Sequence, residues 1–287
     1  MFSIKRDKMK QNENIHHNFT LSEVLFKNFN IVYYMSVIEF STYDLSRNIK
    51  IPEKSNELSE FLGILMGDGY LIDRGRIHKF DITLNLKEDR EYVFFVINLI
   101  KGLFNVIPST LSRPSQNTFD ILVNSKIISK FLLSQEFPNG FKKNMKVPSW
   151  ILEKKQFMYS FLRGLVDTDG SLFFAKRGTY KSNKYPVIEI KTYDKLLLDE
   201  VFNMLSVLNF NPVKQECKIQ LNGVERLNKW LKEIGFKNLN HLSRYYIWKK
   251  FGFCPPNTNL KDRLKLLGRR GRTAMRPISI GESRLQN

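Results

Sequence analysis

The sequence predicts an α+β fold built from two similar halves. Two stretches, 51–71 and 147–172, share one order: a Val/Ile-Pro start, a polar opening, an apolar helix, then Asp-Gly and further apolar residues. Alternating apolar and polar residues follow at 77–86 and 185–193, which is typical of strands. The connections are short, so the strands are expected to pair mainly antiparallel.

An aspartate precedes an apolar-periodic run after each alternating segment. Asp89 and Asp194 hold these positions, and because aspartate is a good N-cap, a helix is expected after each. A further strand-like segment and helix follow, at 118–135 and 217–235. The order helix–strand–strand–helix–strand–helix therefore occurs twice, which indicates an internal duplication.

The duplication predicts four parts of the chain. They are an N-terminal extension at 1–50, a first half-domain at 51–146, a second half-domain at 147–255 and a basic C-terminal tail at 256–287. The last stretch, 268–287, contains five arginines and no lysine. It is expected to be either a disordered run or a basic arm on nucleic acid.

Charge and composition limit the classes of partner. The formal net charge is +18, which favours a polyanion such as nucleic acid over a protein without a charged partner. No apolar run reaches the roughly 18 residues of a membrane span, and no strongly basic amphipathic helix is visible, so no membrane role is expected. Two cysteines exclude a disulfide framework and a CxxC metal site. Abundant Phe, Ile, Asn and Lys are typical of AT-rich genes, which predicts an organelle (mitochondrion or chloroplast) or a bacterial or archaeal cytoplasm.

Two Asp-Gly helix ends are the candidates for chemistry. Asp68 and Asp169 occupy equivalent places in the two halves, 101 residues apart. A plain helix–turn–strand would explain one such copy without any chemistry. A calcium loop is excluded, because the sixth position, which needs glycine, is Leu172 and Gly170 comes too early.

Small residues at a spacing of four predict that the two helices pack closely. Gly63 and Gly67 share one helix face, and Gly164 with Thr168 repeats the spacing. Small residues let helices approach along such a face, an argument stated for membranes that holds for any tight pair.

Close packing would bring the two carboxylates together at the negative ends of two helix dipoles. That arrangement is unfavourable unless a cation lies between them, and a donor set made only of oxygens suits Mg²⁺, or Mn²⁺, rather than zinc. Two carboxylates, a divalent metal and a basic body indicate phosphodiester chemistry.

These residues resemble the motif of the LAGLIDADG homing endonucleases, in the monomeric two-motif form. The nine-residue motif aligns with Phe61–Gly69 and Leu162–Gly170, and the resemblance covers roughly residues 55–250. It implies two pseudo-symmetric αββαββα half-domains, a central two-helix interface and antiparallel saddle-shaped sheets on the DNA major groove. It also implies a double-strand break with short 3′ overhangs in a long double-stranded target, as used in intron or intein mobility.

The resemblance assigns metal ligands and leaves some departures. Asp68 and Asp169 would bind the metal, with the backbone carbonyls of Gly67 and Thr168. Met66 replaces the first motif acid, whereas Asp167 retains it and is expected to act in packing or capping. In the second half, 211–223 barely accommodates the last hairpin, so the second sheet is expected to be shorter.

The family also uses basic or polar residues around the metal-bound water. Lys218 and Lys191 are the candidates in the second half, and Asn85 and Lys87 are their expected counterparts in the first. Arg, Lys, Gln and Asn on groove-facing strands read base edges or contact phosphates. The expected DNA-binding residues are Arg74, Arg76, Lys79, Asn85, Lys87, Arg113, Gln116, Lys176, Arg177, Lys181, Lys184, Lys214 and Gln220.

The leading interpretation is a metal-dependent DNA endonuclease. The strongest alternative is an RNA-binding maturase that assists splicing of its host intron, because the same fold serves both roles and a maturase could keep the acids. A DNA-binding regulator that lost catalysis is a third possibility. Both motif acids are present, which favours cleavage, since a pure binder has no need for clustered negative charge.

Overall fold

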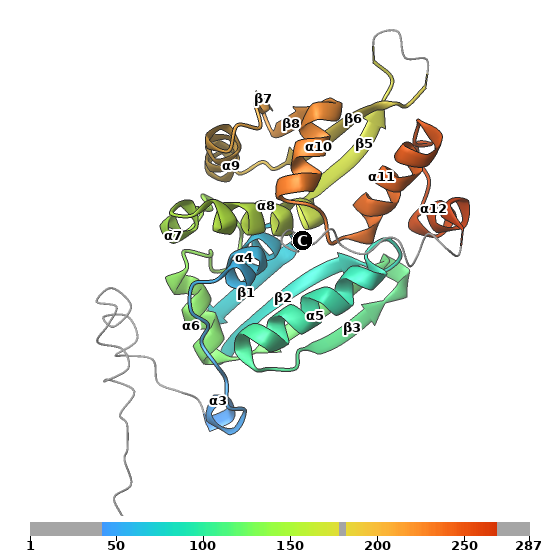
Figure 1. Cartoon of the computed structure of the whole chain (residues 1–287). Helices are drawn as coiled ribbons and strands as arrows, with labels where there is room; N and C mark the ends of the chain where they lie inside the picture. Colours follow the sequence, from blue (N-terminus) through green and yellow to red (C-terminus); the bar gives the residue numbers. More distant parts are fainter. Residues whose placement is uncertain (1–41, 178–181, 269–287) are drawn as a thin grey trace, which may run out of the picture. The chain divides into compact units, whose positions relative to one another are not determined.

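Two four-stranded antiparallel sheets form the framework, and a pair of helices lies between them (Figure 1). The computed structural model describes residues 42–177 and 182–268, all within one unit that begins at Phe40. The first sheet has the strand order β1-β2-β4-β3 and the second has β5-β6-β8-β7. The strands are β1 (Gly69–Arg74), β2 (Ile77–Asn85), β3 (Ser109–Arg113), β4 (Thr118–Asn124), β5 (Gly170–Ala175), β6 (Tyr185–Lys191), β7 (Val213–Gln215) and β8 (Lys218–Asn222).

The helices complete the duplicated order that the sequence predicts. They are α3 (Thr42–Ser46), α4 (Asn56–Asp68), α5 (Arg90–Phe104), α6 (Lys126–Ser134), α7 (Ser149–Leu152), α8 (Lys155–Asp169), α9 (Lys195–Val207), α10 (Val224–Glu233), α11 (Leu239–Phe251) and α12 (Leu260–Leu267), with a 3₁₀ turn at Pro114–Gln116. The order αββαββα runs from α4 to α6 and again from α8 to α10. The predicted α+β class with two similar halves is therefore confirmed. The four domain boundaries stay a prediction, and the stretches 1–41 and 269–287 lie outside the described residues.

The alternation of apolar residues in the sequence predicted β2, β4, β6 and β8, but it did not predict β3 and β7. Every residue of β3 and of β7 is exposed, so neither carries a buried face that would produce an apolar alternation. The last hairpin of the second half is complete, because β7 pairs with β8. The second sheet is shorter, as expected, because β6, β7 and β8 have 7, 3 and 5 residues where β2, β3 and β4 have 9, 5 and 7.

The two predicted aspartate N-caps have different outcomes. The Asp194 side chain accepts a hydrogen bond from the Leu197 N–H at 3.0 Å, which caps α9 as expected. Helix α5 begins directly after Asp89, as predicted, but the Asp89 side chain makes no cap hydrogen bond to it. Its carboxylate instead accepts bonds from the Asn85 N–H at 3.0 Å and from the Asn238 amide at 2.8 Å.

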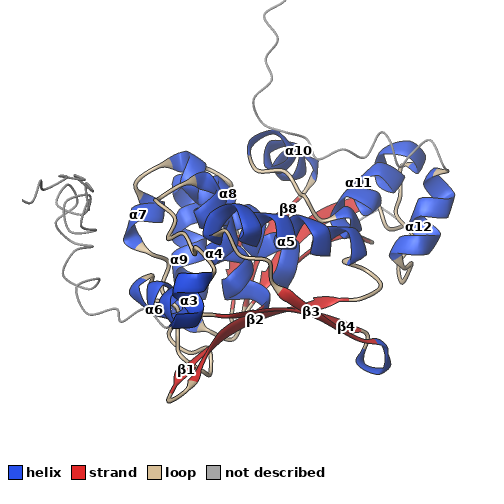
Figure 2. Cartoon of the chain, turned by 90° about the horizontal axis from the view of Figure 1, so that it is seen from below, coloured by secondary structure: helices blue, strands red, loops and turns tan. Residues whose placement is uncertain are grey.

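Aromatic side chains join the helices to one face of each sheet. In the first half, Phe61 of α4 packs edge-on against Phe80 of β2 and Phe104 of α5. In the second half, Phe174 of β5 stacks on Trp248 of α11. Figure 2 shows the helices gathered on one side of the strands of the first sheet. In the part of the chain that the structure describes, the helices leave the other face of the first sheet uncovered.

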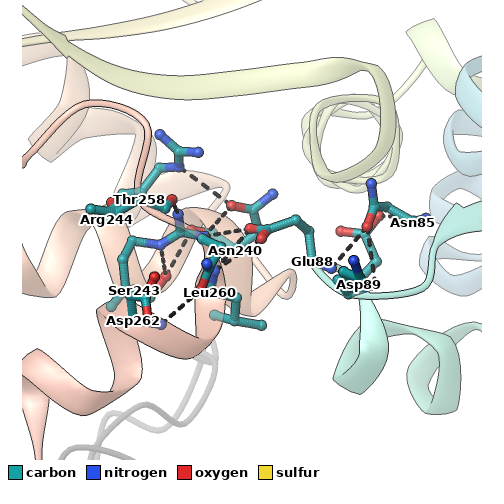
Figure 3. A network of polar contacts seen from close by, with 12 residues as sticks. Asn85, Glu88, Asp89, Asn240, Ser243, Arg244, Thr258, Leu260 and Asp262 are labelled. Atoms are coloured by element: carbon teal, nitrogen blue, oxygen red, sulfur yellow. Dashed lines mark hydrogen bonds and ion pairs between the residues drawn. The ribbon is translucent and has the colours of Figure 1, made fainter. Parts of the chain in front are cut away.

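A buried arginine connects the C-terminal helices to the first half. The Arg263 side chain is 0% exposed and forms an ion pair with Glu88, 2.8 Å between Nη2 and Oε2. It also donates to the Ser243 hydroxyl at 2.8 Å and to the carbonyl of Thr258. Glu88 accepts the Leu260 N–H at the start of α12 as well. Figure 3 shows Glu88 directed toward this C-terminal cluster, so α12 is folded onto the body although it lies in the range assigned to the tail.

Replacing Arg263 with Met should lower the free energy of unfolding by about 2–4 kcal/mol. Breaking a buried ion pair leaves its partner uncompensated, and the Glu88 side chain is mostly buried. Urea unfolding followed by circular dichroism measures the change. Lys265→Met is the matched control, because the Lys265–Asp262 pair is exposed and should contribute less than about 1 kcal/mol. Equal unfolding midpoints for the two variants would show that the buried pair does not hold α12.

None of the helices in the described part of the chain is both long enough and apolar enough to cross a membrane.

Candidate functional site

Helices α4 and α8 touch through their backbones. A Cβ atom placed on Gly63 would lie 2.2 Å from the carbonyl oxygen of Phe161. A Cβ atom placed on Gly164 would lie 2.1 Å from the carbonyl oxygen of Glu60. Both distances are far inside van der Waals contact, so neither position accommodates a side chain. The close helix pair predicted from the small residues is present.

The touching helices end side by side at the predicted metal ligands. Helix α4 ends at Asp68 and α8 ends at Asp169. A Cβ atom on Gly67 would lie 2.0 Å from the hydroxyl oxygen of Thr168, so the last turns of the two helices are also in contact. After each helix the chain passes directly into an edge strand, β1 or β5. The fold therefore brings together all four residues predicted to bind a metal.

The two carboxylates are held in an electrostatically unfavourable place. Burial raises the pKa of Asp68 to about 7, and the negative charges of Asp169 and Asp89 add to this effect. Burial also raises the pKa of Asp169, although part of its side chain stays accessible to solvent. The positive charge of Lys142 lowers the pKa of both acids. The site therefore attracts a cation.

Lys142 is the residue at this site that the sequence did not reveal. It lies between α6 and α7, and its Nζ donates to the carbonyl oxygens of Met66, at 3.2 Å, and of Gly67. Burial lowers the pKa of Lys142, whereas Asp169 and Asp68 raise it. The lysine ammonium thus occupies the end of α4, next to both acids, and neutralises part of their charge.

A repeated triplet could have located this lysine. Gly140-Phe141-Lys142 in the first half corresponds to Gly235-Phe236-Lys237 in the second. The second copy is used differently, because the Lys237 ammonium pairs with Glu60 at 2.9 Å and lies 4.2 Å from the centroid of the Phe95 ring. The two halves are therefore unequal, and only the first copy of the triplet brings its lysine to the acids.

The polar cluster around Glu60 lies on the flank of the helix pair. Arg163 of α8 binds both carboxylate oxygens of Glu60, at 2.9 and 2.6 Å, across the helix interface. Asp167 is buried and accepts the Lys237 N–H at 2.7 Å, and burial raises its pKa to about 8. Asp167 thus fixes the segment after α10, in line with the expected role in packing or capping.

The two lysines predicted to be catalytic lie at one end of the second sheet. Lys191 and Lys218 face each other across the β6–β8 pair. Gly170 pairs with Ile190, so Lys191 lies beside the end of α8. Lys218 is held in an ion pair with Glu189 at 3.1 Å, whereas Lys191 is exposed. Their catalytic role stays a prediction.

Most of the predicted DNA-binding residues lie on the sheet faces opposite the helices or in the turns at their ends. Lys79 and Asn85 of β2 alternate with buried Phe80, Ile82 and Leu84. The Asn85 side chain also organises its turn, because its oxygen accepts the N–H groups of Lys87 and Glu88, each at 3.0 Å. The other residues so placed are Arg74, Arg76, Lys87, Arg113, Gln116, Lys176, Arg177, Lys184 and Gln220. Lys181 lies outside the described residues, and the DNA contacts of this whole set stay predictions.

Lys214 lies on the wrong face of the sheet for the predicted contact. It pairs in register with buried Ile219, and its ammonium binds Asp199 of α9. It also lies 5.6 Å from the centroid of the Phe202 ring, again on the helix side. The sequence pattern could not assign the face, because β7 has no buried residue to set its phase.

The oxygen donors of this site fit a hard divalent cation whose remaining ligands come from another molecule. In the described part of the chain, no group of three or more His, Cys, Asp or Glu side chains is arranged to hold a metal. Asp68 and Asp169 supply two carboxylates, and the carbonyl of Gly67 already accepts a cationic group, the Lys142 ammonium. Mg²⁺ is usually held by one or two carboxylates together with substrate phosphates. These residues therefore fit such a site, with a phosphate as the remaining ligand.

Fold and site together define an α+β protein with two motifs whose central helices present two acids. Residues 156–235 match the family model of the LAGLIDADG-like domain. This match includes the second motif, and it confirms the resemblance that the two motifs indicate. A comparison with curated proteins found no match.

Several solved structures of homing endonucleases are similar to the chain. I-DmoI in complex with DNA and Mn is 17% identical over 62% of this chain and 96% of its own, with a TM-score of 0.44. I-LtrWI bound to target DNA is 13% identical over 76% of this chain and 95% of its own, with a TM-score of 0.46. I-WcaI bound to its DNA recognition sequence is 16% identical over 63% of this chain and 81% of its own, with a TM-score of 0.43.

Proposed function

We propose that this chain is a site-specific DNA endonuclease that makes a metal-dependent double-strand break in a long target. The observation that carries the proposal is the pair of carboxylates, Asp68 and Asp169, at the touching ends of α4 and α8. Their pKa values are raised, so a cation bound beside them would stabilise their ionised forms. The net charge of +18 and the basic sheet faces supply attraction for a polyanion. Both acids are in one chain, so a monomer suffices.

In the proposed site, Asp68 and Asp169 hold Mg²⁺ or Mn²⁺ together with the carbonyls of Gly67 and Thr168. A divalent cation bound there would lower the pKa of a bound water and neutralise charge at the scissile phosphate. The chain itself positions the DNA: the sheet faces opposite the helices bind backbone and bases, and the acids lie between the two sheets. The same DNA completes the metal site, as its two-carboxylate donor set requires.

Lys142 has a position from which it can transfer a proton or stabilise charge on the phosphate. Its lowered pKa makes the ammonium a better proton donor than an exposed lysine. Lys142 now donates to the Gly67 carbonyl, so an ammonium released from that carbonyl would be free to bind a phosphate of the DNA. We therefore assign Lys142 to the catalytic machinery ahead of Lys191 and Lys218.

Replacing Lys142 with Met should slow cleavage about 100-fold or more, in line with the loss of a general acid or base. DNA affinity should fall by less than about 10-fold, because one phosphate contact is lost among many. Single-turnover cleavage and gel-shift titration separate the two effects. Lys143→Met is the matched control, since Lys143 is exposed and adjacent in sequence. Lys142→Arg keeps the charge, so a slow Arg variant indicates proton transfer and an active one indicates charge stabilisation. Equal cleavage by the Lys142 and Lys143 Met variants would contradict the assignment.

Binding measurements distinguish the endonuclease from a maturase. Purified protein is titrated with a double-stranded DNA that spans the junction of the sequences flanking its own gene, and with RNA from the same region. The proposal predicts tighter binding to the DNA than to the RNA and DNA cleavage only when Mg²⁺ is present. Tight RNA binding without any DNA cleavage would contradict it and favour the maturase.

A further inference from the structure

Two aromatic rings are left almost fully in solvent. Phe141 is 84% exposed and Tyr193 is 83% exposed, which makes them the most exposed large apolar side chains of the described part of the chain. Isolated exposed apolar residues are common on protein surfaces and need no explanation by themselves. These two rings differ from the other exposed apolar side chains in their position.

Both rings lie close in the chain to lysines at the ends of α4 and α8. Phe141 directly precedes Lys142, whose ammonium reaches the end of α4. Tyr193 lies two residues beyond β6, and its ring centroid is 5.6 Å from the Nζ of Lys191, the lysine beside the end of α8. The two segments are tied together, because the Met145 N–H donates to the Asp194 carboxylate at 3.0 Å. The two rings therefore belong to connected segments that reach the ends of α4 and α8.

The internal duplication shows that the exposure of Phe141 is not a requirement of its local sequence. Phe236 is the equivalent residue in the second Gly-Phe-Lys triplet, and it is 2% exposed. Its ring packs against Trp230 and His241, with centroid distances of 5.8 and 5.1 Å. The same triplet thus buries its phenylalanine in one half and presents it to solvent in the other, at the acid pair.

The positive charge near the rings indicates the kind of partner that would bind them. Lys142 follows Phe141 in the chain, and the Lys191 ammonium lies over the Tyr193 ring, which favours a molecule with apolar faces and negative charge. Nucleic acid combines both, because bases stack on aromatic rings while phosphates bind lysines. Apolar side chains also act as wedges that partly unstack base pairs and bend the duplex.

We propose that Phe141 and Tyr193 contact the bases at the cleavage point and partly unstack them, so that the deformability of these base pairs contributes to target choice. The inference rests on the proposed function and extends it to residues outside the acid pair and the sheets. Base steps that unstack easily should be preferred at the cleavage point, in the manner of indirect readout.

The test uses full-length protein and its cleavable target with 2-aminopurine placed at each central step in turn. Binding is measured in EDTA, and cleavage is measured with Mg²⁺. The variants are Phe141→Ala, Tyr193→Ala and the double change. Phe94→Ala is the matched control, because Phe94 is also an exposed phenylalanine, at 61%, but lies on α5. The exposed rings make few contacts, so melting temperatures should stay unchanged.

Wild-type protein and the Phe94 variant should raise 2-aminopurine fluorescence severalfold at one or two central steps. Each ring deletion at the acid pair should reduce that signal and weaken binding about 10-fold, within the range for one lost stacking contact. A mismatch at the affected step, which unstacks the DNA beforehand, should restore most of the lost affinity. Fluorescence and cleavage by the Phe141 and Tyr193 variants equal to those of the Phe94 variant would overturn the inference while leaving the endonuclease intact. Failure of the wild-type protein to cleave any target would overturn both.

Discussion

Asp68→Asn and Asp169→Asn should each abolish double-strand cleavage and leave DNA binding nearly unchanged. Asparagine fills the same space but cannot supply the negative charge that holds a divalent cation between the helix ends. The loss should exceed that of any other single change, because both acids serve one metal-binding arrangement. Cleavage is measured on a linear target, and binding is measured by gel shift in EDTA. Asp199→Asn is the matched control, since Asp199 is an exposed acid on α9, on the helix side of the second sheet.

The same replacement of Asp68 should stabilise the protein when no divalent metal is present. The folded-state pKa of Asp68 is raised from 3.8 to about 7, so ionising the group costs folding free energy as the pH rises through that interval. The asparagine variant escapes this cost. Its melting temperature should exceed that of the wild type above pH 7, by an amount that corresponds to up to about 4 kcal/mol, and the difference should vanish near pH 4. Full cleavage by either asparagine variant, or a lower melting temperature at pH 8, would contradict the assignment of the site.

Gly63→Ala and Gly164→Ala should each destabilise the fold by about 3 kcal/mol or more. A single methyl group at these positions would overlap a backbone carbonyl oxygen of the facing helix. Backbone atoms cannot rotate away as a side chain can, so the helices must separate, and the cost lies at or beyond the upper end for overpacked cores. Leucine at either position should prevent folding altogether. Separation would also move Asp68 and Asp169 apart, so cleavage should fall even under conditions where the variant remains folded.

Gly102→Ala provides the control for this prediction. Gly102 lies in α5, and a Cβ atom there would meet no atom within 4 Å. Alanine has the higher helix propensity, so this change should stabilise the protein by about 0.5–1 kcal/mol. Thermal unfolding of the three variants gives the comparison. Melting temperatures that fall equally for Gly63→Ala and Gly102→Ala would contradict the close packing of the central helices.

Local signals predicted the central feature of this protein correctly. The small residues at a spacing of four and the Asp-Gly ends lie within single helices, so the sequence determines their geometry directly. Asp194 caps α9 for the same reason. Because of the duplication, each of these sequence features occurs twice. Two short motifs were therefore enough to predict the helix pair and the position of both acids.

Features that depend on distant segments were missed or misplaced. Lys142 lies 75 residues beyond Gly67 in the chain, and only the fold brings its ammonium to that carbonyl. The side chain of Asp89 was expected to cap α5 but accepts a bond from Asn238, which lies in the other half of the chain. Strand β7 has no buried residue that would set its phase, so the face of Lys214 could not be read from the sequence. Arg263 lies in the range assigned to the basic tail, yet it is buried against Glu88.

A cleavage selection tests the central claim most directly. Wild-type protein and the Asp169→Asn variant are incubated with a DNA library that includes the sequences flanking the gene, joined without the gene. Each protein is tested with Mg²⁺ and with EDTA, and both strands of every recovered end are sequenced. The account predicts paired cuts with short 3′ overhangs at one long site, only with wild-type protein and Mg²⁺. Cleavage by the Asp169→Asn variant, or no cleavage under any condition, would contradict it.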